Sequence, residues 1–437
     1  MMRRGNASCA AVLLIIVSLS WGRSAKAEIL LSDPSSPFEF YSEGRLGGFV
    51  EGVWGQTLPT QFDQNGNLTH AIGDGGINIG GIETPLPMGA TGQGDIRASR
   101  VRSGFLSNII AFGLRRKLTE NTTVRGYISV WADIENENNR AFLAQRPDVR
   151  EGYLRIDGPA GSLLVGRSLT LFSRGATEID FLYAHRYGVG NPAGFDAQGP
   201  SGGFVGYGVI ASTFQAGVVY ATPRFHGFML TAGYFDPARF VGLYWTRTEL
   251  GRPEGEATFD APLGTVGKIH LFLNGAFQKV YAASSTRSDN VYGFGAGGRL
   301  ELSVFRLGVA AHSGQGLGFD YAFDGSTAVL EIATTQALRK FDGLYVQTML
   351  ALGRVDVSAG AGVTRVHEVP ADVILDPATG MPSTSILKQR VGLAAGVVYH
   401  FSEFLHFDID YFRASADWWL GEHQVVNTIN SGMTLNW

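Results

Sequence analysis

Apolar and polar residues alternate with a period of two along most of the chain. At its end, INSGMTLNW places Met433, Leu435 and Trp437 on one face, with Thr434 and Asn436 on the other. A period of two is the geometry of a β-strand, whose successive side chains point to opposite faces. Terminal residues usually fray as polar coil, so this pattern predicts a last strand that keeps an apolar face as far as Trp437.

The same alternation separates an apolar face from a polar face in many earlier segments. Clear examples are TVRGYISVWAD (123–133), FRLGVAAH (305–312), VGLAAGVVYHF (391–401) and LHFDIDYFR (405–413). We expect charged and aromatic side chains of the polar faces to line an aqueous interior: Arg125, Tyr127, Asp133, Arg306, Asp408 and Asp410.

Short and long connections alternate between these segments. Brief turns are expected at 119–121, 158–161, 222–227, 262–268, 353–354 and 402–404, and around Ser303, whereas long polar stretches cover about 56–102, 135–148, 168–212, 315–337 and 370–385. Such long loops are unusual in a compact soluble domain. The breaks delimit sixteen strands, of which EGEATFDA (254–261) is the least regular.

The alternation fits either a β-sandwich or a membrane-spanning barrel. No stretch after the N-terminal segment approaches 18 consecutive apolar residues, so no spanning helix is expected there. Apart from helices, only a closed barrel pairs every backbone group within lipid. Aspartate, arginine, tyrosine and glycine on the polar faces favour a water-filled lumen. The predicted fold is all-β: a transmembrane antiparallel β-barrel of 16 strands with both termini on the periplasmic side, formed by residues 28–437 without a second domain.

The first 27 residues have the features of a cleaved secretory signal peptide. Arg3 and Arg4 precede an apolar run, and Ala25-Lys26-Ala27 precedes Glu28. Removal of this segment takes away the single cysteine and four basic residues, and changes the formal charge from −4 to −8. The mature chain therefore offers neither a disulfide nor a thiolate metal site, and its acidity argues against nucleic acid as a partner.

Four segments of the chain resemble the general diffusion porins of Gram-negative outer membranes. They are VREGYLRIDGPAGSLLVGR (149–167), STFQAGVVYATPRFHGFMLTAGYF (212–235), IDYFRA (409–414) and the closing INSGMTLNW. The resemblance implies a homotrimeric 16-stranded barrel in contact with outer-membrane lipid and lipopolysaccharide. It also implies a third extracellular loop that folds inward, and recognition of Trp437, Leu435 and Met433 by the barrel-assembly machinery.

In this family the inward loop carries acidic residues that face arginines on the wall. By this resemblance the constriction includes Arg150, which opens the fourth strand, Arg167 at the end of the next strand, and the loop carboxylates Glu178 and Asp180. The chain departs from the family at Thr213, where arginine is common, and it lacks the loop's Pro-Glu-Phe stretch. The charge pattern of the constriction is therefore left open.

Other motifs favour simpler interpretations. GFGAGG (293–298) lacks the following helix of a dinucleotide site. His312 and Ser313 are adjacent on one strand and point to opposite faces, which argues against a nucleophilic pair. The histidines show no metal-ligand spacing, and Asp320, Asp324 and Glu331 are interpreted as solvated loop residues rather than a calcium site.

The expected function is passive diffusion of small hydrophilic solutes and ions through a weakly cation-preferring pore, with no cofactor, no metal and no catalytic residue. Two alternatives stay open. One is a substrate-selective porin for sugars or anions on the same barrel, and the other is an outer-membrane barrel enzyme or adhesin.

Overall fold

The computed structural model describes residues 28–32, 38–56, 60–62, 68–70, 95–103, 108–132, 134, 147–179, 181, 204–237, 248–282, 286–318, 320–323, 338–367, 374–375, 382–384, 387–419, 421 and 423–437. The predicted signal segment, 1–27, lies outside these residues, and its cleavage stays a prediction. No described helix is long and apolar enough to cross a membrane.

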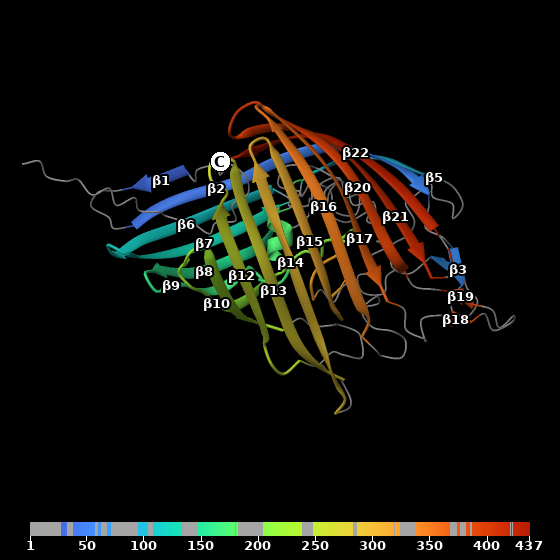
Figure 1. Ribbon diagram of the computed structural model, residues 1–437, viewed down its shortest axis with the longest axis horizontal. Helices are drawn as coiled ribbons and strands as arrows, with labels where there is room; N and C mark the ends of the chain where they lie inside the picture. Colours follow the sequence, from blue (N-terminus) through green and yellow to red (C-terminus); the bar gives the residue numbers. More distant parts are fainter. Residues whose placement is uncertain are drawn as a thin grey trace, which may run out of the picture.

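Antiparallel strands make up nearly all of the described structure (Figure 1). They are β1 (Glu28–Ser32), β2 (Phe38–Gln56), β3 (Thr60–Phe62), β4 (Leu68–His70), β5 (Asp95–Arg102), β6 (Asn108–Thr119), β7 (Thr122–Ala132), β8 (Asp148–Gly158), β9 (Gly161–Leu169), β10 (Phe214–Ala221), β11 (Phe228–Phe235), β12 (Arg252–Pro262), β13 (Gly267–Tyr281), β14 (Ser288–Leu302), β15 (Phe305–Gln315), β16 (Lys340–Leu352), β17 (Val355–Val366), β18 (Ile374–Leu375), β19 (Pro382–Thr384), β20 (Leu387–His400), β21 (Leu405–Trp418) and β22 (His423–Asn436). One short helix, α1 (Arg174–Ile179), follows β9 among the described residues.

The strands close into a barrel because β22 pairs with β2. On its other side β2 pairs first with β5 and then with β6, so these two segments act as one interrupted strand. With β1 as an added piece and the hairpins β3–β4 and β18–β19 outside the wall, the described residues form a closed barrel of sixteen strands. This confirms the predicted fold and strand number, including β12 at the irregular segment 254–261.

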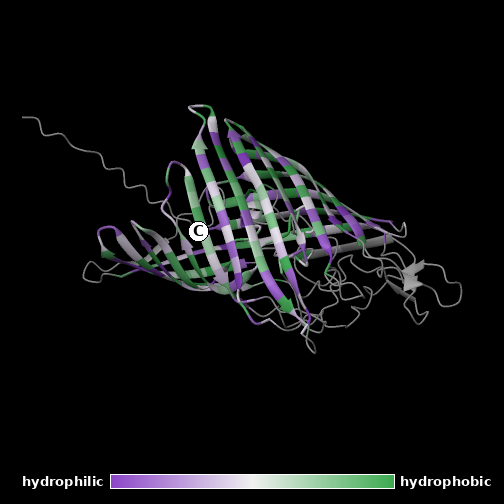
Figure 2. Ribbon diagram, turned by 60° about the horizontal axis from the view of Figure 1, so that its bottom comes forward, coloured by the Kyte–Doolittle hydropathy of each residue, from purple (hydrophilic) through white to green (hydrophobic). Residues whose placement is uncertain are grey.

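Hydrophobic and hydrophilic residues alternate along the strands of the wall (Figure 2), and the exposure of the side chains assigns them to two faces. On β20, Leu393 and Val397 are exposed on the outside, whereas Val398 and His400 face inward and are buried. Outward-facing aromatic residues lie near both ends of the strands, for example Phe225, Phe228 and Phe404 beside the short turns and Trp54 and Tyr234 toward the long connections. An apolar exterior with aromatic borders fits a bilayer and its two interfaces.

Candidate functional site in the barrel lumen

The connection between β9 and β10 enters the barrel, where the wall anchors it at several points. Glu254 accepts hydrogen bonds from the backbone N–H groups of Leu171 and Phe172, each at 2.7 Å. Tyr345 donates its hydroxyl to the Ala176 carbonyl at 2.6 Å, and the Gly208 N–H donates to the Thr364 hydroxyl at 2.7 Å. Because these partners come from β12, β16 and β17, the described parts of the connection, 170–179 and 204–213, occupy the interior; we name them the inserted segment.

A second connection, between β15 and β16, contributes to the same interior. Its described part runs beside the inserted segment: the Ala211 N–H donates to the Asp320 carbonyl, and the Ala322 N–H donates to the Ala211 carbonyl, both at 2.8 Å. Arg390 of β20 donates to the Asp320 carboxylate at 3.0 Å, and both side chains are buried. This corrects the interpretation of Asp320 as a solvated outer-loop residue: its backbone pairing and its ion pair hold it inside the barrel.

The helix α1 carries charged residues into the lumen. Arg174 forms ion pairs with Glu256 of β12 and, at 3.9 Å, with Glu178 one turn along the helix. Burial raises the pKa of the Glu178 carboxyl above its usual value; the Arg174 guanidinium opposes this rise and the Glu256 carboxylate adds to it. Glu178 therefore lies inside the barrel, as the family resemblance implies for the loop.

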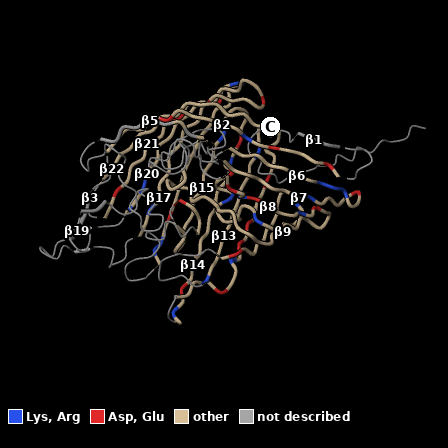
Figure 3. Tube along the Cα trace, turned by 180° about the vertical axis from the view of Figure 1, so that it is seen from behind, with Lys and Arg blue, Asp and Glu red and all other residues tan. Residues whose placement is uncertain are grey.

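The wall opposite, formed by β2 and β6–β8, carries three parallel rows of inward-facing side chains. Directly paired residues of an antiparallel sheet share a face, so the register defines each row. Starting from the end with the short turns, the rows are as follows: Glu39, Arg115, Arg125 and Arg155; Tyr41, Gly113, Tyr127 and Tyr153; and Glu43, Ala111, Ser129 and Glu151. Figure 3 shows charged residues of both signs along these strands.

The arginines of the first row are matched with carboxylates. Arg125 and Arg155 both contact Asp157, at 3.5 Å and 2.7 Å, and Arg115 pairs with Glu39. In the second row, the rings of Tyr127 and Tyr153 stack with a centroid separation of 5.1 Å.

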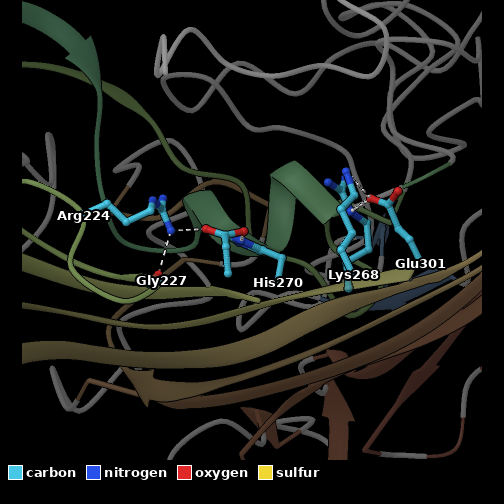
Figure 4. Close-up of polar contacts among 7 residues, drawn as sticks. Arg224, Gly227, Lys268, His270 and Glu301 are labelled. Carbon is cyan, nitrogen blue, oxygen red and sulfur yellow. Dashed lines mark hydrogen bonds and ion pairs between the residues drawn. The ribbon is translucent and has the colours of Figure 1, made fainter. Parts of the chain in front are cut away.

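A further polar network lies near the short turns of β12–β15 (Figure 4). Asp260 contacts Arg224 and the His270 ring, the latter at 2.8 Å, while Glu301 contacts Lys268, Arg299 and Arg306 at 3.4, 2.9 and 3.9 Å. This network places Arg306 on the lumen side of β15.

Most of the pore-lining residues expected from the sequence lie on the inward face. Arg125, Tyr127 and Arg306 line the lumen, and Asp408 and Asp410 are buried there between β20 and β22. Asp133 and Asp180 lie outside the described residues.

The two wall arginines expected at the constriction differ in position. Arg150 lies with its guanidinium carbon 4.5 Å from the ring centroid of Trp131, a lumen-facing residue of β7, and pairs with Asp148 at 3.1 Å. Arg167 is opposite Gly152 in the register, on the face that holds Leu163 and Val165. These residues are exposed on the outer surface, so the register removes Arg167 from the lumen.

Several lumen residues were not anticipated from the sequence, although the signal was present. Glu43, Tyr41, Tyr153 and Glu151 belong to FEFYSEGR and VREGYLRIDG, which alternate in the same way as the segments at 123–133 and 405–413. The buried pair Arg252–Glu254, at 2.6 Å, offered no such signal, because its role depends on an inserted segment distant in sequence.

The motifs set aside in the sequence remain within regular strands. GFGAGG is part of β14, and His312 is buried on the inward face of β15 while its neighbour Ser313 is exposed. Within the described ranges, no group of three His, Cys, Asp or Glu side chains is arranged to hold a metal ion.

Comparison with solved structures places this architecture among known channels. The chain superposes on the outer-membrane channel DcaP of Acinetobacter baumannii with a TM-score of 0.62 and 11% identity, covering 93% of this chain and 99% of DcaP. It superposes on an anion-selective porin from Comamonas acidovorans with a TM-score of 0.56 and 12% identity (92% and 100% covered). For Salmonella typhi OmpF in complex with daunomycin, the values are 0.52 and 10% (92% and 98% covered). No protein-family model and no curated protein sequence matches the chain.

These neighbours share a closed 16-stranded barrel. The chain therefore has the fold of the Gram-negative outer-membrane porins. This fold is that of an integral outer-membrane β-barrel.

Proposed function

We propose that the chain is a passive channel through which small hydrophilic solutes and ions cross the outer membrane down their gradients. The observation that carries this proposal is the reversal of polarity across one closed wall, with exposed apolar side chains outside and charged side chains inside. No bond needs to be made or broken in this function: exclusion follows from the width left by the inserted segment, and selectivity follows from fixed charge.

We further propose a weak preference for cations. Among the described residues that are buried, eight are carboxylates and four are arginines, so negative charge predominates among the most buried charged groups. The formal charge of −8 expected for the mature chain has the same sign. Fixed charges in a confined passage raise the local concentration of counter-ions, an effect screened over about 8 Å at physiological salt.

The proposed assembly is a homotrimer in outer-membrane lipid and lipopolysaccharide, reached through the barrel-assembly machinery. Leu163 and Val165 of β9 present an apolar outer surface, and both lie in the segment 149–167 that resembles the family. The inner neighbour Leu164 is opposite Arg155 and faces the lumen, so the outer pair is the part available to another subunit.

An anion-selective channel is the rival supported by a specific feature, the row of Arg115, Arg125 and Arg155. Each of these arginines has a carboxylate partner, which reduces its attraction for solute anions.

Planar-bilayer recording of the purified protein distinguishes the proposals. We expect ohmic conductance in potassium chloride. In a salt gradient the sign of the reversal potential should indicate a preference for cations, and this preference should become smaller in concentrated salt. An anionic reversal potential would favour the rival channel, and the absence of conductance together with hydrolysis of lipid or peptide would favour an enzyme.

A further inference from the structure

Two carboxylates on the β2 and β6–β8 wall have no cationic partner within the described part of the chain. Glu43 accepts a hydrogen bond from the Tyr127 hydroxyl at 2.8 Å, and Glu151 accepts one from the Ser129 hydroxyl at 3.2 Å. Glu151 is only 7% exposed. A buried carboxylate without a positive partner is costly, so the site favours the arrival of a cation.

Both carboxylates approach the same strand, β7. Ala111 of β6, which lies between β2 and β7, leaves room for Glu43 to extend across that strand to Tyr127. Glu151 approaches from β8 on the opposite side and contacts Ser129, two residues further along β7. Two carboxyl groups therefore border one short stretch of the wall.

Within the described residues, no arginine of this wall forms an ion pair with Glu43 or Glu151. Arg125 and Arg155 lie one row closer to the short turns and share Asp157. Arg45, buried on the same face of β2, lies one row toward the long connections. At the level of Glu43 and Glu151 themselves, the ionisable groups without an ion pair are therefore carboxyls.

Tyrosine rings line the same place. Tyr127 and Tyr153, both half-buried, stack at 5.1 Å with an interplanar angle of 24°. The ring of Tyr41 lies directly against the backbone of Gly113, where an added Cβ would be only 2.0 Å from it. Aromatic faces attract cations electrostatically, most effectively those that are weakly hydrated.

The location puts this surface on the route of a permeating solute. Trp131, one row toward the long connections, donates its indole N–H to the Ser129 hydroxyl at 3.0 Å. Trp131 also packs against Val205 and Ala211 of the inserted segment. The carboxylates and tyrosines therefore lie immediately beside the point where the inserted segment meets the wall.

We propose that Glu43, Glu151, Tyr127 and Tyr153 form a binding site for small organic ammonium ions, with quaternary ammonium as the preferred class. This inference rests on the proposed channel function and specifies one class of solute within it. The carboxylates supply the charge, and the tyrosine rings distinguish a methylated ammonium ion from a hydrated potassium ion.

The test compares tetramethylammonium with potassium in the purified full-length barrel. We expect tetramethylammonium chloride to reduce the potassium current at millimolar concentration, and we expect saturable binding by calorimetry in detergent. The double variant Glu43→Gln/Glu151→Gln should lose this binding. Tyr153→Leu should weaken tetramethylammonium binding about tenfold, and its effect on potassium conductance should be smaller. Glu120→Gln, which removes one carboxylate from an exposed turn, is the matched control and should change neither.

The calorimetric arm separates this inference from the channel function. Binding of tetramethylammonium without any conductance would overturn the proposed function and leave the site standing. Conductance without saturable binding would overturn the site alone. An equal response of potassium and tetramethylammonium to Tyr153→Leu would also overturn it, because a general field of fixed charge does not depend on the ring.

Discussion

Glu178 lies on α1 inside the barrel, where burial and the Glu256 carboxylate raise its pKa while Arg174 lowers it. A glutamate is charged above its pKa, so a raised pKa means that the negative charge is lost at a higher pH than for an ordinary glutamate, whose pKa is about 4.3. We predict that cation preference declines as pH falls, and that the decline begins above this ordinary value. Reversal potentials recorded in a salt gradient between neutral and acidic pH measure this decline in cation preference.

The variant Glu178→Gln should show a lower cation preference at neutral pH and a flatter pH dependence. Glu120→Gln serves again as the control, because its position in an exposed turn keeps it away from the passage. A wild-type pH profile that survives unchanged in Glu178→Gln would show that another group controls it.

At the residue scale, alternation predicted faces well wherever the strand was regular. A period of two alone predicts that Arg125, Tyr127 and Asp408 face inward, and they lie there. Arg167 was placed by a family motif rather than by its strand, and a shift of one residue moves a side chain to the opposite face. Because Arg167 pairs directly with Gly152, its side chain lies on the outer face of the barrel.

At the scale of elements, strands and turns were predictable, but the inserted parts were not. The turns at 119–121 and 158–161 have strong local signals and appear where expected. The packing of Asp320 against Ala211 depends on two connections that are more than 100 residues apart, so no local pattern reveals it. The second connection therefore helps to hold the inserted segment in place inside the barrel.

The buried Asp320–Arg390 pair should therefore hold the inserted segment in place. We predict that Asp320→Asn lowers the stability of the segment, because breaking a buried ion pair by removing one of its charges costs about 3–5 kcal/mol. The measurable results are larger current fluctuations in bilayers and faster proteolysis within 204–213. The barrel strands themselves should keep their circular-dichroism signal.

Replacing both partners by apolar residues, Asp320→Leu with Arg390→Met, provides the comparison. This change removes both charges of the pair and should be milder than Asp320→Asn. If Asp320→Asn showed the same current fluctuations and the same protease resistance as wild type, the pair would have no role in holding the inserted segment.

At the scale of the whole molecule, the outer face of β9 offers a test of the proposed homotrimer. Val165 is 49% exposed on the isolated barrel, and Val397 of β20 is 42% exposed on another strand. We predict that Val165→Arg converts the trimer to monomers in analytical ultracentrifugation, whereas Val397→Arg does not. Both substitutions carry a similar cost of about 2–4 kcal/mol on a lipid-facing surface. A monomeric wild-type protein, or equal effects of the two variants, would contradict the assignment of the interface.

The closure of the barrel gives the last residue a structural role beside that of an assembly signal. Trp437 and Gly44 exchange backbone hydrogen bonds of 3.0 and 3.1 Å, and the indole N–H donates to Ser42 at 3.3 Å. These contacts extend the β2–β22 pairing by which the first and last strands of the wall meet. Gly44 is required because a Cβ there would approach the Trp437 ring within 2.4 Å.

We therefore predict that deletion of Trp437 and the substitution Gly44→Val both lower the amount of folded barrel in the outer membrane. The first removes the contacts, and the second displaces the indole from Gly44. Heat-modifiable migration of membrane fractions on gels measures the folded fraction. Gly126→Val is the matched control, because an added Cβ at Gly126 of β7 meets no atom within 4 Å. If Gly44→Val folded normally while the deletion did not, Trp437 would act through recognition by the assembly machinery rather than through closure. Normal levels of both variants would remove Trp437 from either role.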